Sequence, residues 1–317
     1  MSSIRKAYLP LCLHLQLPDM TFRNGVSIRS LSNSEKPDLS SWGQFMSPDE
    51  IARVSGFGRW MCLDFAVKHD HQGGGTAVEA KASKTLANTM VALQVAAPVG
   101  CYIFDIFLQA GGPSLDLYQI DHNQILTSTG CARMIGDGSL SPEEIKKVVN
   151  GVLALIESGE PRLSTPLGLL LSGMSSGDPY VKTLLWVGAI DSILMASKAK
   201  VFEERLCRLL GADTEVFPGL EDHGVPPYSV KGLAFDLYSL RNQIAHGGAI
   251  LPKFLQRPSA GSAVNASASY PGLSTYAGVL HEASILLLSR LLREIVLRDM
   301  LPTFCELKQW EQLLKVR

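Results

Sequence analysis

The sequence predicts an α+β protein, in which a mixed α/β domain over residues 1–135 precedes an all-α domain over residues 140–317. Before residue 135, apolar and polar residues alternate in several short runs, as expected of half-buried strands. Beyond residue 140, apolar residues recur at every third or fourth position, as expected of helices that bury one side. With 317 residues, the chain is long enough for two domains that each have a core.

The elements of the first domain follow from these runs. Four alternating segments predict strands, and they are Leu11 to Leu17, Met61 to Val67, Tyr102 to Leu108 and Leu115 to Ile120. Between the second and third segments, Thr76 and Glu79 have the spacing of a capping box, in which each side chain bonds the other residue's backbone N–H. A helix is therefore expected from Thr76 to about Val95.

Helices account for the second domain. Ser141, Pro142 and Glu144 form a capping box with proline at the first helical position, which predicts a helix to about Ser158. The further helices are expected from Asp178 to Gly211, around Arg241, from Tyr276 to Met300 and from Phe304 to Leu314. Residues 257–274 are rich in Ser, Ala, Gly and Pro, which indicates a flexible loop that is either a lid or a tolerated surface insertion.

Composition excludes several classes of protein. Hydrophobic residues make up 46% of the chain and charged residues 19%, which excludes disorder. The net charge of −1 excludes a uniformly basic nucleic-acid binder, so any RNA site must be a local patch. The six cysteines form no CxxC pair, so a reducing compartment fits better than a disulfide framework. Because no apolar run reaches membrane-spanning length and no signal-peptide cleavage pattern occurs, we expect a cytoplasmic protein without a membrane partner.

The most informative segment is the predicted helix that contains Arg241, Asn242 and His246. Its apolar residues recur at spacings of three and four and predict one buried face, and they are Val230, Leu233, Leu237, Leu240 and Ile244. At about 100° per residue, Asn242 and His246 lie roughly opposite that face, and Arg241 lies on its flank. The three polar side chains are therefore expected to point away from the helix's own core.

The segment Arg-Asn-x-x-Ala-His-Gly at the end of this helix resembles the Arg-x4-His signature of HEPN domains, in particular the Apea-like HEPN branch. The resemblance covers roughly Asp178 to Phe304. HEPN domains are small helical bundles that pair through the motif helix, and many are metal-independent endoribonucleases. The resemblance implies that Arg241 and His246 are the catalytic pair, with Asn242 as the polar residue between them, in a homodimer that needs no cofactor.

These residue types suit RNA cleavage, because a histidine can move a proton near neutral pH and a guanidinium can hold two phosphate oxygens. A two-fold pairing of motif helices would bring two such pairs into one cleft. His246 lies in the last helical turn, where the helix dipole favours the protonated imidazole and therefore a general-acid role. The alternative interpretation is structural: Arg241 and His246 complete the helix end, and Gly247 supplies a left-handed cap.

Two further groups of residues are candidates for supporting the site. Asp191 interrupts an apolar row on the preceding helix, and it either orients Arg241 or His246 or forms a purely structural ion pair. The basic residues that are candidates for guiding an RNA phosphate backbone are Lys198, Arg205, Arg290 and Arg293. Nearby glutamates, such as Glu203 and Glu294, make a solvated surface of mixed charge the alternative for these residues.

A metal site is a more distant candidate. His69 and His71 follow a predicted strand and could supply two ligands from one loop. No third ligand is evident near them in the sequence, so no metal is expected. The glycines that follow lack the Lys-Ser/Thr pair of a phosphate loop, which favours a plain turn.

As the resemblance implies, the sequence predicts a homodimeric HEPN endoribonuclease that acts on RNA, of the kind that serves as a toxin or antiphage defence effector. Its α/β domain would sense a trigger or restrain the nuclease, and a partner protein would neutralise or activate it. The alternative is a non-catalytic HEPN module that binds RNA or nucleotide or mediates dimerisation.

Overall fold

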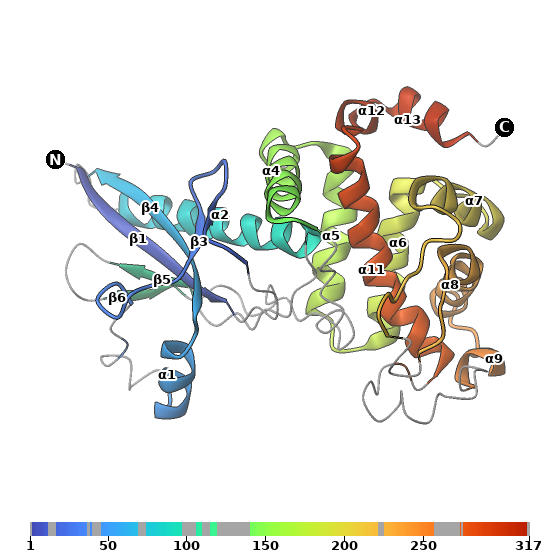
Figure 1. Cartoon of the computed structure of the whole chain (residues 1–317), viewed down its shortest axis with the longest axis horizontal. Helices are drawn as coiled ribbons and strands as arrows, with labels where there is room; N and C mark the ends of the chain where they lie inside the picture. Colours follow the sequence, from blue (N-terminus) through green and yellow to red (C-terminus); the bar gives the residue numbers. More distant parts are fainter. Residues whose placement is uncertain are drawn as a thin grey trace.

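The computed structural model describes residues 2–11, 17–36, 39, 46–68, 74–96, 106–109, 115–118, 140–220, 225–256, 273 and 275–315. Figure 1 shows a β-sheet at one end of the molecule and a bundle of helices at the other. The strands of the sheet precede Ser141 in the chain, and the bundle helices follow it. The predicted α+β class is therefore confirmed.

The described strands form one antiparallel sheet with the order β2-β3-β4-β1-β5-β6. Their bounds are β1 Ser2–Leu11, β2 Met20–Thr21, β3 Ser27–Arg29, β4 Arg59–Lys68, β5 Ile106–Gln109 and β6 Leu115–Tyr118. The long strands β1 and β4 pair along their whole length, with Tyr8 opposite Cys62. These two strands form the centre of the sheet.

The helices, in chain order, are α1 Pro48–Ser55, α2 Gly74–Ala96, α4 Pro142–Ser158, α5 Pro161–Ser175, α6 Pro179–Leu194, α7 Ala199–Leu210, α8 Val230–Ala245, α9 Pro252–Leu255, α11 Tyr276–Leu297, α12 Leu301–Cys305 and α13 Leu307–Leu314. The capping box predicted for α4 is present. The Ser141 hydroxyl accepts from the Glu144 backbone at 3.3 Å, and Glu144 Oε2 accepts from the Ser141 backbone at 2.8 Å. Helix α11 is the centre of the bundle, and even its Arg290 and Arg293 are buried.

Both faces of the sheet are covered, and each has its own apolar cluster. On one face, Tyr8, Trp60 and Cys62 pack with residues of α1. On the other face, Met61 and Leu63 join a larger core that includes residues of α2 and of the bundle. This burial on both faces explains why apolar residues occupy consecutive positions in β4.

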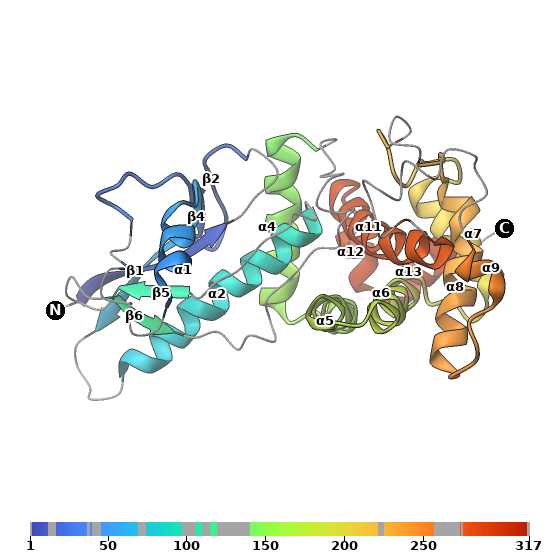
Figure 2. The same cartoon turned by 90° about the horizontal axis from the view of Figure 1, so that it is seen from below.

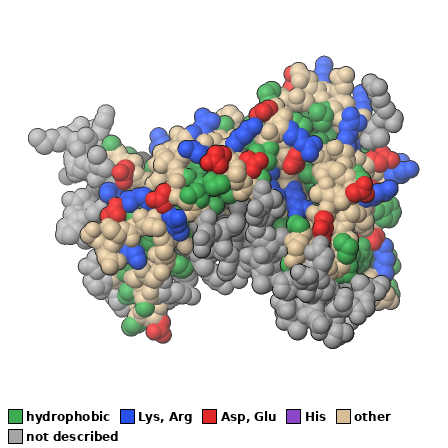
Figure 3. Space-filling model, in the orientation of Figure 1, with side chains coloured by type: hydrophobic (Ala, Val, Ile, Leu, Met, Phe, Trp, Pro, Cys, Tyr) green, Lys and Arg blue, Asp and Glu red, His purple; other side chains and the backbone are tan. Residues whose placement is uncertain are grey.

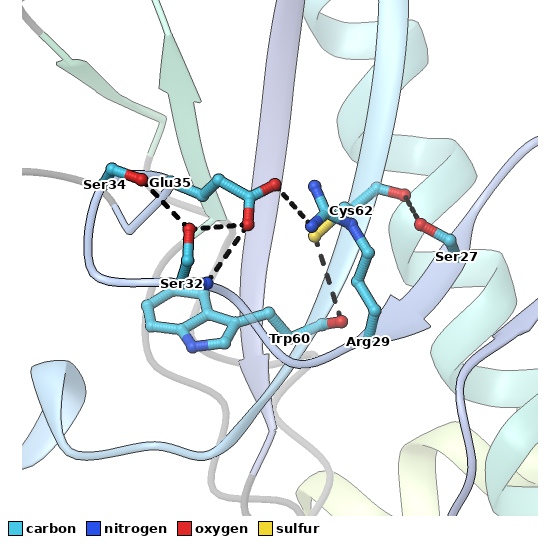
Figure 4. Close-up of polar contacts among 7 residues, drawn as sticks. All are labelled: Ser27, Arg29, Ser32, Ser34, Glu35, Trp60 and Cys62. Atoms are coloured by element: carbon cyan, nitrogen blue, oxygen red, sulfur yellow. Dashed lines mark hydrogen bonds and ion pairs between the residues drawn. The ribbon is translucent and has the colours of Figure 1, made fainter.

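An ion pair between Arg29 and Glu35 holds the loop that follows β3, as Figure 4 shows. Arg29 Nη1 lies 2.6 Å from Glu35 Oε1, and both the backbone N–H and the hydroxyl of Ser32 donate to Glu35 Oε2. These hydrogen bonds, that from Arg29 above all, lower the pKa of Glu35 to about 2. Nearby, burial raises the pKa of the Cys62 thiol to about 11, so this cysteine is not a nucleophile at neutral pH.

Helix α2 joins the sheet to the bundle. Figure 2 shows it extending from the sheet to α4, and it packs on β1 and β4 at one end and on α4 and α11 at the other. The buried Arg293 of α11 donates to the Ala96 carbonyl at the end of α2, at 3.3 Å. One apolar core therefore includes described residues from both predicted domains, 1–135 and 140–317.

The long helix expected from Asp178 to Gly211 is wrong, because two helices, α6 and α7, occupy this segment and are bent by 73°. Met195 ends α6 in a left-handed conformation, with φ of 53°. Arg205 Nη1 donates to the carbonyls of Leu194 and Met195, at 2.7 and 2.6 Å, and so satisfies the free end of α6. The periodicity of the segment reveals neither the bend nor this contact.

Other boundaries differ from the predictions as well. The first strand precedes the segment Leu11 to Leu17 and ends at Leu11, and residues 12–16 lie outside the described part of the chain. Thr76 lies inside α2 rather than at its N-cap. Helix α5, which contains Pro166, was not predicted, nor were α1, β2 and β3, which are short. The last predicted helix is divided into α12 and α13.

Among the described residues, no single helix has both the length and the apolarity needed to cross a membrane. The consecutive helices α6 and α7 reach those values only when they are taken together across their bend.

Gly173 of α5 is required by the close approach of α6. A Cβ at this position would lie 2.3 Å from Nε1 of Trp186, which donates to the Leu170 carbonyl. We expect Gly173→Ala to lower the free energy of unfolding by about 1–3 kcal/mol, as overpacking does. Gly168→Ala, in the same helix with open space around it, should raise that free energy by about 0.5–1 kcal/mol. Urea denaturation measures both, and equal effects would contradict the tight α5–α6 contact.

His281 of α11 is a buried histidine that packs between helices. Its ring stacks on Trp186 with centroids 5.3 Å apart, and Nδ1 lies 3.0 Å from the hydroxyl of Thr183. Burial, assisted by the charge of Lys182, lowers the pKa of His281 to about 4. The neutral imidazole is therefore the form that belongs to the folded protein at neutral pH.

The pKa of His281 predicts a loss of stability in acid. The unfolded chain binds a proton at this histidine below pH 6.5, whereas the folded chain does so only near pH 4. Its contribution to stability should be complete above pH 6.5 and should be lost as the pH falls toward 4. We expect the free energy of unfolding of His281→Phe to fall less over this pH range. Urea denaturation at several pH values measures it. The same slope in both proteins would contradict the burial of a neutral imidazole.

Candidate functional site

Helix α8 carries the motif at the end of the molecule opposite the sheet, beside α9 (Figure 1). Ser229 caps its start by accepting a hydrogen bond from the Gly232 backbone at 3.1 Å. The Val230 N–H donates to the carbonyl of Thr214, which lies just beyond the end of α7, at 2.9 Å. Because α8 begins where α7 ends and the two pack together, they are antiparallel, and Phe202 in the first turn of α7 packs against Tyr238 of α8.

The buried face predicted for α8 is confirmed. Of the residues predicted for this face, those at most 1% exposed are Val230, Leu233, Leu237 and Leu240. Ile244 is partly buried and packs against the same core. His246 is exposed and Asn242 is half-buried, so both lie off this face as expected.

Arg241 is held by three neighbours within its own chain. Its Nη2 lies 3.5 Å from Asp191 Oδ2, and its Nη1 donates to Asn242 Oδ1 at 2.9 Å. The guanidinium carbon lies 5.5 Å from the ring centroid of Tyr238, which in turn packs against the ring of Phe202 on α7. The Arg241 side chain is 27% exposed, so its guanidinium is oriented without being closed off from solvent.

Asp191 of α6 is the acidic partner in this arrangement. Burial raises the pKa of its carboxyl above the usual value, while the charge of Arg241 and the backbone N–H of Ala196 act in the opposite direction. Of the two partners considered for Asp191, the contact is with Arg241 and not with His246. A partly buried carboxylate on a neighbouring helix thus fixes where the motif arginine lies.

His246 is the C-cap residue that follows α8, in an exposed Schellman motif. Gly247 adopts a left-handed φ of 63°, and its N–H donates to the Ile244 carbonyl at 3.1 Å. The Gly248 N–H donates to the Gln243 carbonyl at 3.0 Å, which completes the cap. The structural role considered for Gly247 is therefore present. This cap leaves the His246 imidazole in solvent, about 140° around the helix axis from Arg241.

The basic residues predicted to guide RNA do not form one surface. Arg290 and Arg293 are buried, and Arg290 donates to the backbone carbonyls of Glu215 and Val216, so the prediction is wrong for these two arginines. Arg205 is half-buried and caps α6, whereas Lys198 is exposed at the start of α7. On the face in Figure 3, basic and acidic side chains are interspersed, which agrees with the mixed-charge alternative.

The described residues contain no group of three or more His, Cys, Asp or Glu side chains that could hold a metal ion. His69 and His71, the predicted metal candidates, lie outside the described residues, as do residues 257–272 of the predicted loop. The chemistry available in the described site is therefore that of a held guanidinium, an amide and an exposed imidazole.

No protein-family model, curated protein or solved structure matches this chain.

Tyr238 is the member of the site that we did not predict. It lies three residues before Arg241 on α8, a spacing that places two side chains on neighbouring parts of a helix surface. That spacing indicates that Tyr238 can contact Arg241. The sequence did not show that Phe202 would pack on the tyrosine ring, because this contact comes from a different helix.

The contact between Asp191 and Arg241 should be measurable as a coupling. We expect a double-mutant cycle of Asp191→Ala and Arg241→Ala to give a coupling free energy of about 1 kcal/mol or more, because both groups are partly buried. The matched control is the more exposed pair Glu294 and Arg298, where about 0.3–0.5 kcal/mol is expected. Chemical denaturation of each set gives the values. A coupling no larger than that of the control would contradict the role of Asp191 in holding the arginine.

Proposed function

We propose that this chain is a metal-independent endoribonuclease of the HEPN type, which acts as a homodimer in the cytoplasm as a toxin or antiphage defence effector. One observation carries the proposal. At the exposed end of α8, Arg241 is held by Asp191 and Asn242, while His246 faces solvent. The Arg-x4-His spacing of this pair is the feature that resembles the HEPN signature.

The chemistry is a transesterification. The 2′-hydroxyl oxygen attacks the adjacent phosphorus, the bond to the 5′-oxygen breaks, and the products are a 2′,3′-cyclic phosphate and a 5′-hydroxyl. One group must accept the 2′-hydroxyl proton, another must protonate the leaving oxygen, and positive charge must stabilise the phosphorane. In the proposal, His246 of one copy protonates the leaving 5′-oxygen and His246 of the second copy accepts the 2′-hydroxyl proton. Arg241 supplies the charge, oriented by Asp191 and by Asn242.

A second copy of the chain is part of the proposal, since the imidazole and the guanidinium lie on different sides of α8. A two-fold axis near the last turn of α8 would bring the histidine of one copy toward the arginine of the other. Residues 245–249 are exposed, and the sheet lies at the opposite end of the molecule, so this turn is open to a partner. The N-terminal domain would then signal through α2 to α11, in response to a trigger or a partner protein.

The alternative is a non-catalytic HEPN module that binds RNA or nucleotide or mediates dimerisation. The contacts of Arg241 favour this alternative, because its Nη1 and Nη2 atoms already contact Asn242 and Asp191. In addition, the Schellman cap provides a structural reason for Gly247 after His246. The two functions differ in one measurable respect, which is whether bound RNA is cut.

The nuclease proposal predicts loss of cleavage without loss of the fold. His246→Ala should abolish RNA cleavage and change the free energy of unfolding by less than about 0.5 kcal/mol, because the side chain is exposed. Arg241→Ala should also abolish cleavage. Leu240→Ala is the control on the buried face, and it should destabilise the protein by about 2–5 kcal/mol. Gel-based cleavage assays and urea denaturation give the two readouts.

The same assays distinguish the mechanism. Cleavage should continue in the presence of a chelator, leave a 2′,3′-cyclic phosphate, and fail at a nucleotide whose 2′-hydroxyl is replaced by hydrogen. Cleavage that stops with chelator and returns with a divalent ion would instead favour His69 and His71. Binding without cleavage under every condition would favour the non-catalytic module. In cells, growth arrest on expression should depend on His246.

A further inference from the structure

The outward face of α8 has a chemical pattern that extends beyond the residues used in the nuclease proposal. Its residues lie within about 80° of arc around the helix and over roughly 22 Å of its length, and they are Lys231, Phe235, Ser239, Asn242 and His246. Lys231 and His246 are exposed, and Ser239 and Asn242 are half-buried. A cation, an aromatic ring, a hydroxyl and an amide therefore lead along one face to the imidazole.

Phe235 lies at the centre of this face and is 48% exposed. The helix does not need it for packing, since the core residues of α8 lie on the opposite side. Exposed aromatic rings are the usual platforms on which proteins stack unpaired bases, because every base has a π face. Along the helix axis, Phe235 lies roughly 16 Å from His246, so a base stacked on it would belong to a nucleotide flanking the one that is cut.

The charge of this region favours an anionic occupant. Beyond Asp236, the rest of α8 contains no acidic residue, and its one cation, Arg241, is paired with Asp191. Asp236 itself lies at the side of α8, where it accepts from Lys253 Nζ at 2.6 Å. The outward face thus carries Lys231 and no carboxylate. A second copy would present the same cation to this surface, whereas a phosphate backbone complements it.

We propose that the outward face of α8 binds single-stranded RNA, with Phe235 stacking on a base and Lys231 contacting a phosphate of the strand that reaches His246. The proposal rests on the proposed nuclease function and names its substrate class. Paired bases are stacked inside a duplex and cannot reach the ring, so double-stranded RNA is excluded as the preferred substrate. Pairing of two copies at residues 245–249 leaves the Phe235 half of α8 free to carry the strand.

The test measures binding of a labelled, short single-stranded RNA to the full chain by fluorescence anisotropy. His246→Ala serves as the parent, so that the RNA is not consumed. We expect Phe235→Ala and Phe235→Leu to weaken binding roughly five- to hundred-fold, and Phe235→Trp to bind like the parent, because stacking needs a planar ring. Leu307→Ala is the matched control, since Leu307 is an equally exposed apolar residue on α13, at 49%. It should not change binding.

Two further measurements test the assignment of each residue. On a ribose-phosphate strand without bases, Phe235→Ala should have no effect, because there is nothing to stack. Lys231→Ala should weaken binding to RNA of every sequence. It should also lower, by about one, the slope of the logarithm of the binding constant against the logarithm of the salt concentration. Parent-like binding by Phe235→Leu, an equal loss with Leu307→Ala, or no RNA binding by the parent would overturn the proposal. So would a fall in molecular mass on Phe235→Ala, which would identify the face as a contact between copies.

These outcomes separate the binding face from the nuclease itself. If the unmutated chain binds RNA through Phe235 but never cuts it, the proposed catalysis fails and the binding face stands. If the unmutated chain cuts RNA and Phe235→Leu binds and cuts equally well, the binding face fails and the catalysis stands.

Discussion

The burial of α11 on every side is the constraint on which the rest of the structure depends. A helix that carries two arginines can be buried only if its neighbours satisfy the guanidinium groups. Arg290 donates to the Glu215 and Val216 carbonyls at 2.6 and 3.1 Å, and Arg293 donates to the Ala96 carbonyl. These bonds use backbone acceptors, so they determine where the chain itself passes.

The position of the candidate site follows from this arrangement. The segment that Arg290 holds continues to Ser229, which pairs with Glu215 in an isolated β-bridge and caps α8. Helix α8 therefore starts at the end of α7 and runs back along it toward the corner between α6 and α7. That corner contains Asp191, which meets Arg241 because Met195 turns the chain away immediately afterwards. Contacts far from the motif thus decide the orientation of its arginine.

The shared core has a consequence for how the N-terminal region could act. Helix α2 packs on the sheet and on α4 and α11, and Asn150 of α4 accepts from the Arg23 backbone at 2.9 Å. Arg23 also pairs with Glu157 of α4 at 3.3 Å. A change in the sheet would therefore reach the bundle through packed helices, and α8 lies at the far end of that path (Figure 1). Regulation of the exposed end of α8 by the sheet would have to be indirect.

Elements whose signals are local could be predicted from the sequence. The capping box at Ser141 and the apolar spacing of Val230 to Ile244 depend on residues close together in the chain, and both are present in the structure. The exposure of His246 also followed, because a helix with one buried side must show the other to solvent.

The tertiary structure alone decided what depends on residues distant in the chain. A sequence does not show which lysines and arginines are exposed. The same prediction of RNA contact therefore covers Lys198, which is exposed, and Arg293, which is buried against α2. At the break after Met195, the end of α6 is likewise satisfied by Arg205 of the next helix. Asp191 was recognisable as an acid that needs a partner. Its contact with Arg241 depends on the packing of α6 against α8. Hydrogen bonds and burial are properties of the space around a side chain, and not of its neighbours in sequence.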